Sequence, residues 1–163
     1  MTLLGVAAVL FFGANVRAGD AAAPEVPVAA GVSYQRIGAY SVDRLNAILT
    51  TELAAFSDYP ASYPPARNAV VLYRITYPSV VPEQNNRPTV ATGLLAVPEG
   101  AGKDALPVVS YQHGTVFSRT EVPSHLDESM ETRLMIAQFA GHGAIAVGTV
   151  SIGQGGWPAP GRV

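Results

Sequence analysis

The sequence contains no cysteine among its 163 residues. Disulfide bonds and thiolate metal sites are therefore excluded, and the compartment has to be inferred from other features. Charged residues are also few, at 13%, against an average of about 25% for globular proteins. The ten basic and twelve acidic side chains form no run, and the net charge is −2. This charge pattern gives no support for a nucleic-acid partner.

Length and composition predict one domain with a substantial apolar core. A chain of 163 residues is long enough for one domain and short for two. Apolar residues make up 48% of the chain, so material for a core is plentiful. Thirteen prolines and sixteen glycines predict many turns and argue against a helical bundle.

The N-terminal segment has the pattern of a signal peptide. Residues 3–12, LLGVAAVLFF, form an apolar run of signal-peptide length that is too short to span a bilayer. Val16 and Ala18 then offer small side chains at −3 and −1 of a cleavage site before Gly19. Because no Lys or Arg precedes the apolar run, a buried segment of the fold stays as the alternative. We expect residues 1–18 to direct export, giving a secreted or periplasmic protein without a stable membrane anchor.

A flexible linker and one folded unit are expected after the signal peptide. Residues 19–33 are rich in Ala, Pro and Gly without periodicity, which is typical of a linker, and residues 34–163 remain for a partial domain. Ser41 is a candidate N-cap for a helix with apolar residues at helical spacing. These apolar residues are Val42, Leu45, Ile48, Leu49, Leu53 and Phe56. The helix should pack its apolar face against the domain.

Three segments rich in β-branched and aromatic residues predict strands. Residues 68–77 (NAVVLYRITY) and 89–97 (TVATGLLAV) are joined by a connection too short for a crossover helix, so we expect antiparallel neighbours. Residues 107–111 (PVVSY) are continuously apolar or aromatic apart from one serine. Such a run is typical of a buried strand covered on both faces, as in a parallel sheet.

A strand-helix-strand unit is predicted from the third strand onward. Ser129 or a near neighbour can cap a helix with a wide apolar arc that ends at Gly141. Residues 143–147 (GAIAV) follow as another buried strand, which a right-handed crossover makes parallel to residues 107–111. The predicted fold class is therefore α/β, with an antiparallel strand pair followed by a parallel strand-helix-strand unit.

A His-Gly pair ends the third strand. Gly114 follows His113 and lets the backbone turn, so the amides that follow can point above the strand's carboxyl end. In open α/β sheets that end is where ligands bind. The alternative is that His113 only terminates the strand and forms local hydrogen bonds.

Three segments resemble, in order and spacing, the α/β-hydrolase superfamily and within it the secreted lipase and esterase-like branch. They are VVLYRITYPSV, TVATGLLAVPEG and PVVSYQHGT, and the resemblance covers roughly residues 68–148, about half the chain. In that family a strand that runs into His-Gly-X supplies one backbone N–H of the oxyanion hole. The resemblance implies His113 and Gly114 as the motif pair and Thr115 as the amide donor. It also implies carboxylic esters with apolar acyl chains as substrates.

The other parts of a serine hydrolase site are missing from the sequence. Ser151 lies in TVSIG, which has Thr where the nucleophile motif Gly-x-Ser-x-Gly begins with glycine. Relatives of the branch read Asp-Tyr-x-Gly-x-Gly here, and in this chain Val150 and Ser151 replace the first two residues, whereas Gly153 and Gly155 fit. The family's acid and His base come later in chain order. We therefore expect an incomplete α/β-hydrolase domain, the N-terminal fragment of an exported serine hydrolase, without nucleophile, acid or base.

Two other classes of protein are possible alternatives, a metal-binding protein and a non-catalytic binding domain. His113, His125 and His142 are 12 and 17 positions apart, which matches no compact zinc motif, so we expect no metal and no cofactor. A secreted non-catalytic α/β binding domain stays as the alternative function. In a complete form of the hydrolase, the partner would be a small-molecule ester and not a nucleic acid.

Overall fold

The computed structural model describes residues 23–58, 61–100, 105–112 and 129–149. Their elements are β1 (Val26–Ala29), β2 (Val32–Tyr40), α1 (Val42–Ala47), the π-helical turn η1 (Ile48–Glu52), α2 (Leu53–Phe56), β3 (Val70–Val81), the 3₁₀ turn η2 (Pro82–Gln84), β4 (Arg87–Pro98), β5 (Val108–Tyr111), α3 (Met130–Phe139), the 3₁₀ turn η3 (Ala140–His142) and β6 (Ile145–Thr149). The predicted signal peptide at residues 1–18 lies outside the described residues. Within the described part of the chain, no helix is long and apolar enough to cross a membrane.

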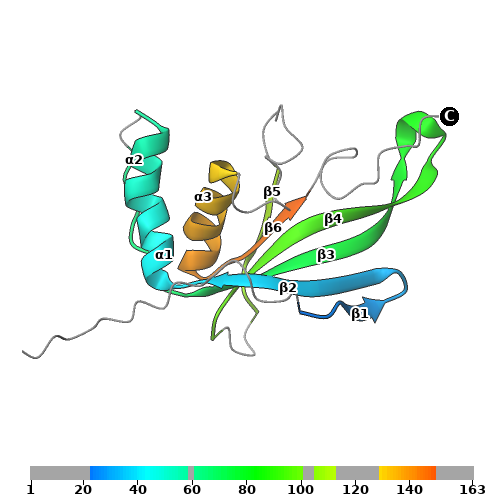
Figure 1. Cartoon of the computed structure of the whole chain (residues 1–163), viewed down its shortest axis with the longest axis horizontal. Coiled ribbons are helices and arrows are strands. Elements are labelled where there is room, and N and C mark those ends of the chain that lie inside the picture. The colour runs from blue at the N-terminus through cyan, green and yellow to red at the C-terminus, as the bar shows by residue number, and fades with distance from the viewer. Residues whose placement is uncertain (1–22, 59–60, 101–104, 113–128, 150–163) are drawn as a thin grey trace, which may run out of the picture.

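The described strands form one six-stranded sheet in the order β1-β2-β3-β4-β6-β5 (Figure 1). β3 and β4 are antiparallel over their whole length, as the short connection between them predicts. β6 pairs antiparallel with β4 and parallel with β5, so the strand that follows α3 is inserted between β4 and β5. The predicted α/β architecture, an antiparallel pair followed by a parallel strand-helix-strand unit, is confirmed.

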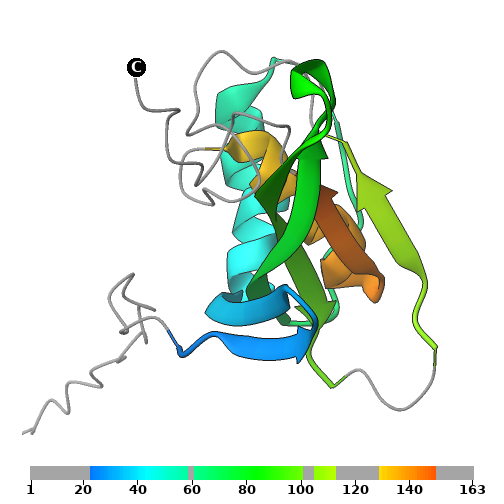
Figure 2. The same cartoon turned by 90° about the vertical axis from the view of Figure 1, so that its right-hand side faces the viewer.

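The core lies between one face of the sheet and the described helices (Figure 2). Alternate residues of the central strands point into it, because successive side chains of a strand face opposite sides of the sheet. The largest fully buried side chains are Leu45, Ile48, Val70, Leu72, Leu94, Thr132, Met135 and Ile136. Helices α1 and α3 and strands β3 and β4 therefore share a single core.

The first helical segment begins as predicted. The Ser41 side chain accepts a hydrogen bond from the backbone N–H of Arg44 at 3.2 Å, which caps α1. Most of the predicted apolar stripe is buried, but Phe56 at the end of α2 is 67% exposed. The prediction is wrong for Phe56 because the π-helical turn η1 widens the helix and shifts the stripe, and α2 ends at this residue.

Two further predictions are corrected by the sheet. β1 pairs with β2, so residues 26–33 belong to the sheet and not to a linker that extends over residues 19–33. All four residues of β1 are exposed, so the segment carries no alternating pattern to reveal it. β5 is not covered on both faces by the described residues: it lies at the end of the sheet, and its Val108 is 64% exposed.

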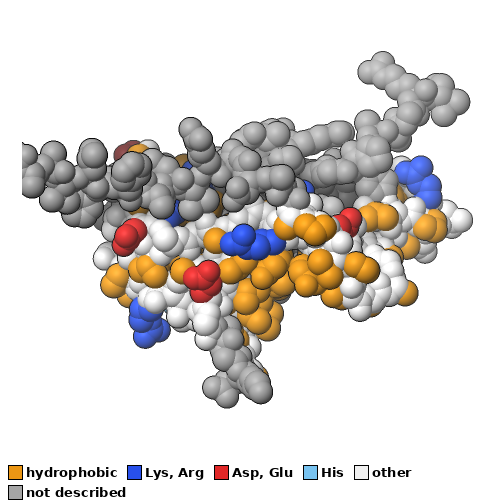
Figure 3. All heavy atoms as spheres, turned by 60° about the horizontal axis from the view of Figure 1, so that its bottom comes forward, with side chains coloured by type: hydrophobic (Ala, Val, Ile, Leu, Met, Phe, Trp, Pro, Cys, Tyr) orange, Lys and Arg blue, Asp and Glu red, His pale blue; other side chains and the backbone are white. Residues whose placement is uncertain are grey.

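The sheet face opposite the described helices is also apolar. Tyr73 and Ile75 alternate with the buried Leu72 along β3, and both are half-buried on that opposite face. Tyr34 contacts Tyr73 there edge to face, with ring centroids 5.6 Å apart. Figure 3 shows hydrophobic side chains gathered on the part of the surface turned toward the viewer, with few charged groups among them. The described helices thus cover only one of the two apolar faces of the sheet.

Candidate active-site edge of the sheet

The carboxyl ends of β5 and β6 lie side by side. Tyr111 is paired with Gly148 in the parallel register. One residue further along each strand, the Thr149 hydroxyl donates a hydrogen bond to the side-chain oxygen of Gln112 at 3.0 Å. In open α/β sheets the carboxyl ends of parallel strands form the ligand-binding edge. We refer to Tyr111, Gln112 and Thr149 as the candidate edge.

Helix α3 begins at the same edge and is held there by its cap. The Ser129 hydroxyl oxygen accepts hydrogen bonds from the Thr132 backbone N–H at 3.1 Å and from the Thr132 hydroxyl at 2.8 Å. Both residues are buried. The sequence prediction of a cap at Ser129 is therefore confirmed, and the cap satisfies a free N–H group of the first turn of α3.

A second contact joins that first turn to β5. The Tyr111 hydroxyl donates a hydrogen bond to the carboxylate of Glu131. The ring of Tyr111 is half-buried and packs against the core. Burial of the ring, together with the hydrogen bond to Glu131 and the negative charge of that carboxylate, raises the pKa of Tyr111 well above its ordinary value. The phenol is therefore a hydrogen-bond donor throughout the physiological pH range.

Helix α3 is also connected to the first helical segment by charged groups. The Glu52 carboxylate forms ion pairs with Arg44 of α1 and with Arg133 of α3, the latter with 3.2 Å between Nε and Oε2. Ion pairs of partly exposed groups add little stability. Their main effect is to link α3 to the first helical segment through the carboxylate of Glu52.

The predicted oxyanion turn lies outside the described residues. His113, Gly114 and Thr115 follow directly after Gln112, the last described residue of this part of the chain. His125 and Ser151 also lie outside the described residues.

His142 lies at the other end of α3, in η3. Its Nδ1 is 2.8 Å from the Gln138 carbonyl oxygen and its Nε2 is 3.1 Å from the Pro64 carbonyl oxygen. These contacts tie the end of α3 to the loop before β3. Among the described residues, no group of three or more His, Cys, Asp or Glu side chains could hold a metal ion. His142 therefore has a structural role in this part of the chain.

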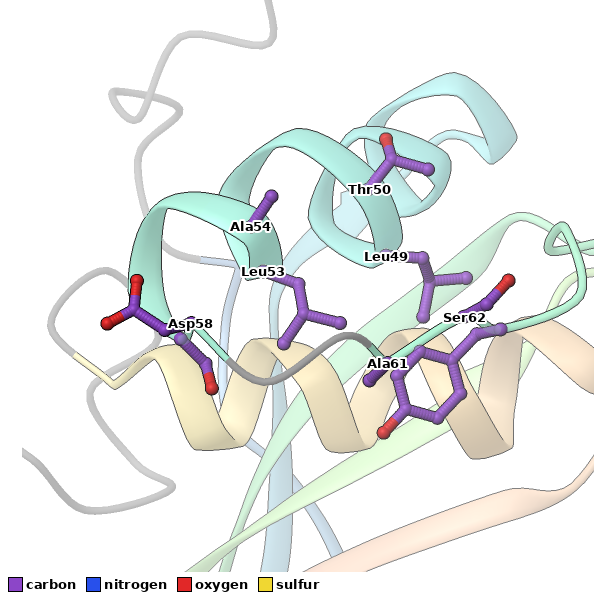
Figure 4. A pocket seen from close by; sticks show the side chains of 9 residues that line it. Leu49, Thr50, Leu53, Ala54, Asp58, Ala61 and Ser62 are labelled. Atoms are coloured by element: carbon purple, nitrogen blue, oxygen red, sulfur yellow. The ribbon is translucent and has the colours of Figure 1, made fainter.

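A separate open cavity of about 360 Å³ lies between η1, α2 and the loop that follows them (Figure 4). Leu49 and Leu53 supply its apolar side, Asp58 supplies a carboxylate, and Tyr63 also lines it. Tyr63 belongs to the loop rich in Pro and Tyr that precedes β3. The Pro- and Tyr-rich composition of this loop is a weak indication of the cavity in the sequence.

No local pattern in the sequence indicates the contacts between Tyr111 and Glu131 or between Gln112 and Thr149. The partners are 20 and 37 residues apart in the chain. They meet only because β6 is inserted beside β5 and α3 begins at the same edge. The signal that was available is positional: each polar residue stands where a predicted strand ends or a predicted helix begins.

Comparisons with known proteins identify the fold. No family model matches the sequence, and no curated protein matches it. A protein of Legionella pneumophila that is provisionally assigned as a hydrolase superposes with a TM-score of 0.55 at 23% identity, over 77% of this chain and 30% of that one. The rice cell wall degrading esterase LipA from Xanthomonas oryzae superposes with a TM-score of 0.52 at 21% identity, over 71% of this chain and 27% of that one.

These likenesses show an α/β-hydrolase-like fold. The antiparallel strands followed by the parallel β5-α3-β6 unit correspond to part of the fold of both neighbours. The chain spans less than a third of the length of either neighbour.

Proposed function

We propose that this chain forms the N-terminal part of an exported serine hydrolase that cleaves carboxylic esters. In this proposal the turn at His113, Gly114 and Thr115 supplies a backbone amide of the oxyanion hole. The observation that supports it most is the place of Gln112, at the carboxyl end of β5 and beside the end of β6. The proposed turn thus starts at the edge of the sheet where this fold class binds ligands.

The chemical task of the turn is to stabilise negative charge. When a serine attacks an ester carbonyl, the carbonyl oxygen becomes an oxyanion, and backbone N–H groups about 2.7–3.1 Å away stabilise it. Gly114 suits this task because a residue without Cβ lets the backbone approach the reacting carbon closely. The N–H of Thr115 would then donate to the oxyanion, while its side chain need not take part.

The remaining groups are assigned to polypeptide beyond residues 1–163. The structural neighbours are more than three times as long as the stretch they share with this chain, which leaves room there for the nucleophile, the acid and the His base. The name of the Xanthomonas oryzae protein is that of an esterase, which agrees with the resemblance seen in the sequence. Esters with apolar acyl chains are the proposed substrate class.

Fluorophosphonate labelling tests this proposal, because the probe forms a covalent adduct only with an activated serine. The test uses two proteins: residues 1–163 alone, and the longer polypeptide that continues them. We expect one adduct per molecule of the longer polypeptide, mapped by peptide mass spectrometry to a Gly-x-Ser-x-Gly serine beyond Val163, and none on residues 1–163. An adduct on Ser151 would refute the proposed division of the site.

Export is the second part of the proposal and has its own measurement. If residues 1–18 form a signal peptide, N-terminal sequencing of the secreted or periplasmic protein should begin at or near Gly19. Recovery of the intact Met1 terminus from the cytoplasm, with none of the shortened form outside it, would refute export.

The cavity beside α2 favours a second candidate function, a secreted non-catalytic binding domain. The apolar side chains of Leu49 and Leu53 and the carboxylate of Asp58 could together bind an amphipathic small molecule. This candidate predicts no fluorophosphonate adduct on either protein. It also predicts that Ala54→Arg, at an exposed position that lines the cavity, abolishes ligand binding, whereas the hydrolase proposal gives Ala54 no role.

A further inference from the structure

A side-chain pair closes the connection between β5 and α3 at its base. Tyr111 ends β5 and Glu131 lies in the first turn of α3. The hydrogen bond from the Tyr111 hydroxyl to the Glu131 carboxylate joins these positions, which are 20 residues apart. His113 is the second residue after Tyr111 and therefore lies just inside the closed connection.

Both partners of this pair are attached to rigid elements. The ring of Tyr111 packs against the core, and its backbone is paired with Gly148 of β6. Glu131 follows Ser129, whose side chain caps α3 from a buried position. A hydrogen bond to a carboxylate is shorter and stronger than one between neutral groups. The pair can therefore hold the end of β5 at a set place relative to α3.

We propose that Tyr111 and Glu131 are positioning residues that clamp the base of the β5-to-α3 connection and fix the direction in which the chain enters the turn at His113. The catalytic role of that turn rests on the proposed function, whereas the clamp between Tyr111 and Glu131 does not depend on it. Its value to a hydrolase follows from geometry, because a misplacement of about 1 Å in a catalytic group can cost about 100-fold in rate.

The raised pKa of Tyr111 agrees with this role. Burial of the ring and the neighbouring Glu131 carboxylate keep the phenol protonated, so the hydroxyl proton that makes the bond is retained. At the same edge, Gln112 accepts a hydrogen bond from Thr149. The residue between the clamp and the turn is therefore itself tied to β6.

Hydrogen exchange measured by mass spectrometry tests the clamp on residues 1–163, at low micromolar protein concentration. Tyr111→Phe removes only the hydroxyl, and Glu131→Ala removes the acceptor. Each change should speed exchange of the amides at residues 112–116 about tenfold, while exchange in β3 stays within about twofold. Tyr73→Phe is the matched control, because it removes the same group from a ring on the opposite face of the sheet.

Glu131→Gln separates the hydrogen bond from the charge. The glutamine side-chain oxygen can still accept from Tyr111, so exchange at residues 112–116 should stay within about threefold of the wild-type rate. If Tyr111→Phe leaves that exchange unchanged, or speeds it equally in β3, the clamp is refuted. Exchange in Glu131→Gln as fast as in Glu131→Ala would also contradict it.

This experiment is independent of hydrolysis. Faster exchange in Tyr111→Phe without a fluorophosphonate adduct on the longer polypeptide would leave the clamp standing and refute the proposed function alone. An adduct together with unchanged exchange would refute the clamp alone.

Discussion

The cap of α3 offers a sharp test of how this edge of the sheet is held. In Ser129→Ala the helix loses its N-cap, which costs about 1 kcal/mol of unfolding free energy in typical cases. The Thr132 hydroxyl, which is 1% exposed and donates to Ser129, also loses its acceptor. A buried polar group left without a partner costs about 1–3 kcal/mol. The expected total loss is therefore about 2–4 kcal/mol.

Two further variants separate these contributions. Ser41→Ala removes the exposed cap of α1 and should cost only about 0.5–1 kcal/mol, because no buried hydroxyl is orphaned there. Ser129→Ala combined with Thr132→Val also removes the orphaned donor, so the double variant should be more stable than Ser129→Ala alone. The unfolding free energies are measured by urea titration with far-ultraviolet circular dichroism at low micromolar concentration.

Two outcomes would refute this reasoning. One is a cost of Ser129→Ala no greater than that of Ser41→Ala, since the buried hydroxyl would then add nothing. The other is a double variant that is no more stable than Ser129→Ala alone, because the Thr132 hydroxyl would then not depend on Ser129.

Three other predictions follow from the described contacts. Val108 is exposed on the terminal strand β5, so residues 1–163 should self-associate in light scattering and Val108→Lys should reduce association; a monodisperse wild-type monomer would contradict this. Burial and a neighbouring carboxylate raise the pKa of Tyr111 above its ordinary value of 10.0. The stabilisation of the folded state by the protonated phenol is therefore present below pH 10 and lost as pH rises toward the folded-state pKa. A difference in unfolding free energy between wild type and Tyr111→Phe that grows above pH 10 would contradict this. A Cβ at Gly93 would lie 3.0 Å from the Gly148 carbonyl oxygen, whereas one at Gly38 meets nothing within 4 Å. Gly93→Ala should therefore lower the unfolding free energy by about 1–3 kcal/mol more than Gly38→Ala. Equal losses would refute a steric clash at Gly93.

The features predicted correctly from the sequence are those determined by local chemistry. Ser41 and Ser129 each precede an apolar helical pattern, and a serine there can satisfy free N–H groups whatever the tertiary fold. The pairing of β3 with β4 followed from a connection too short to hold a crossover helix. The parallel pairing of β6 with β5 followed from the helix predicted between them, because parallel neighbours need a crossover connection of this kind.

The features that sequence reasoning missed depend on distant parts of the chain. β1 is an exposed strand without a buried face, and its residues do not alternate between apolar and polar, so only its pairing with β2 reveals it. The apolar run in β5 predicts a strand that is buried on both faces, but burial depends on which other elements pack against the strand. The contact of Tyr111 with Glu131 exists because α3 begins above β5, which no short pattern encodes. The role of His113, Gly114 and Thr115 stays a prediction.

The most direct test of the central claim compares two neighbouring substitutions in the longer polypeptide that the proposed function requires. The measured quantity is kcat/KM for hydrolysis of a p-nitrophenyl ester. Gly114→Val should lower it about 100-fold or more, because a side chain there displaces an oxyanion-hole amide, whereas Thr115→Ala keeps its amide and should lower it less than about tenfold. Equal and small effects of the two substitutions would show that this turn does not stabilise the oxyanion.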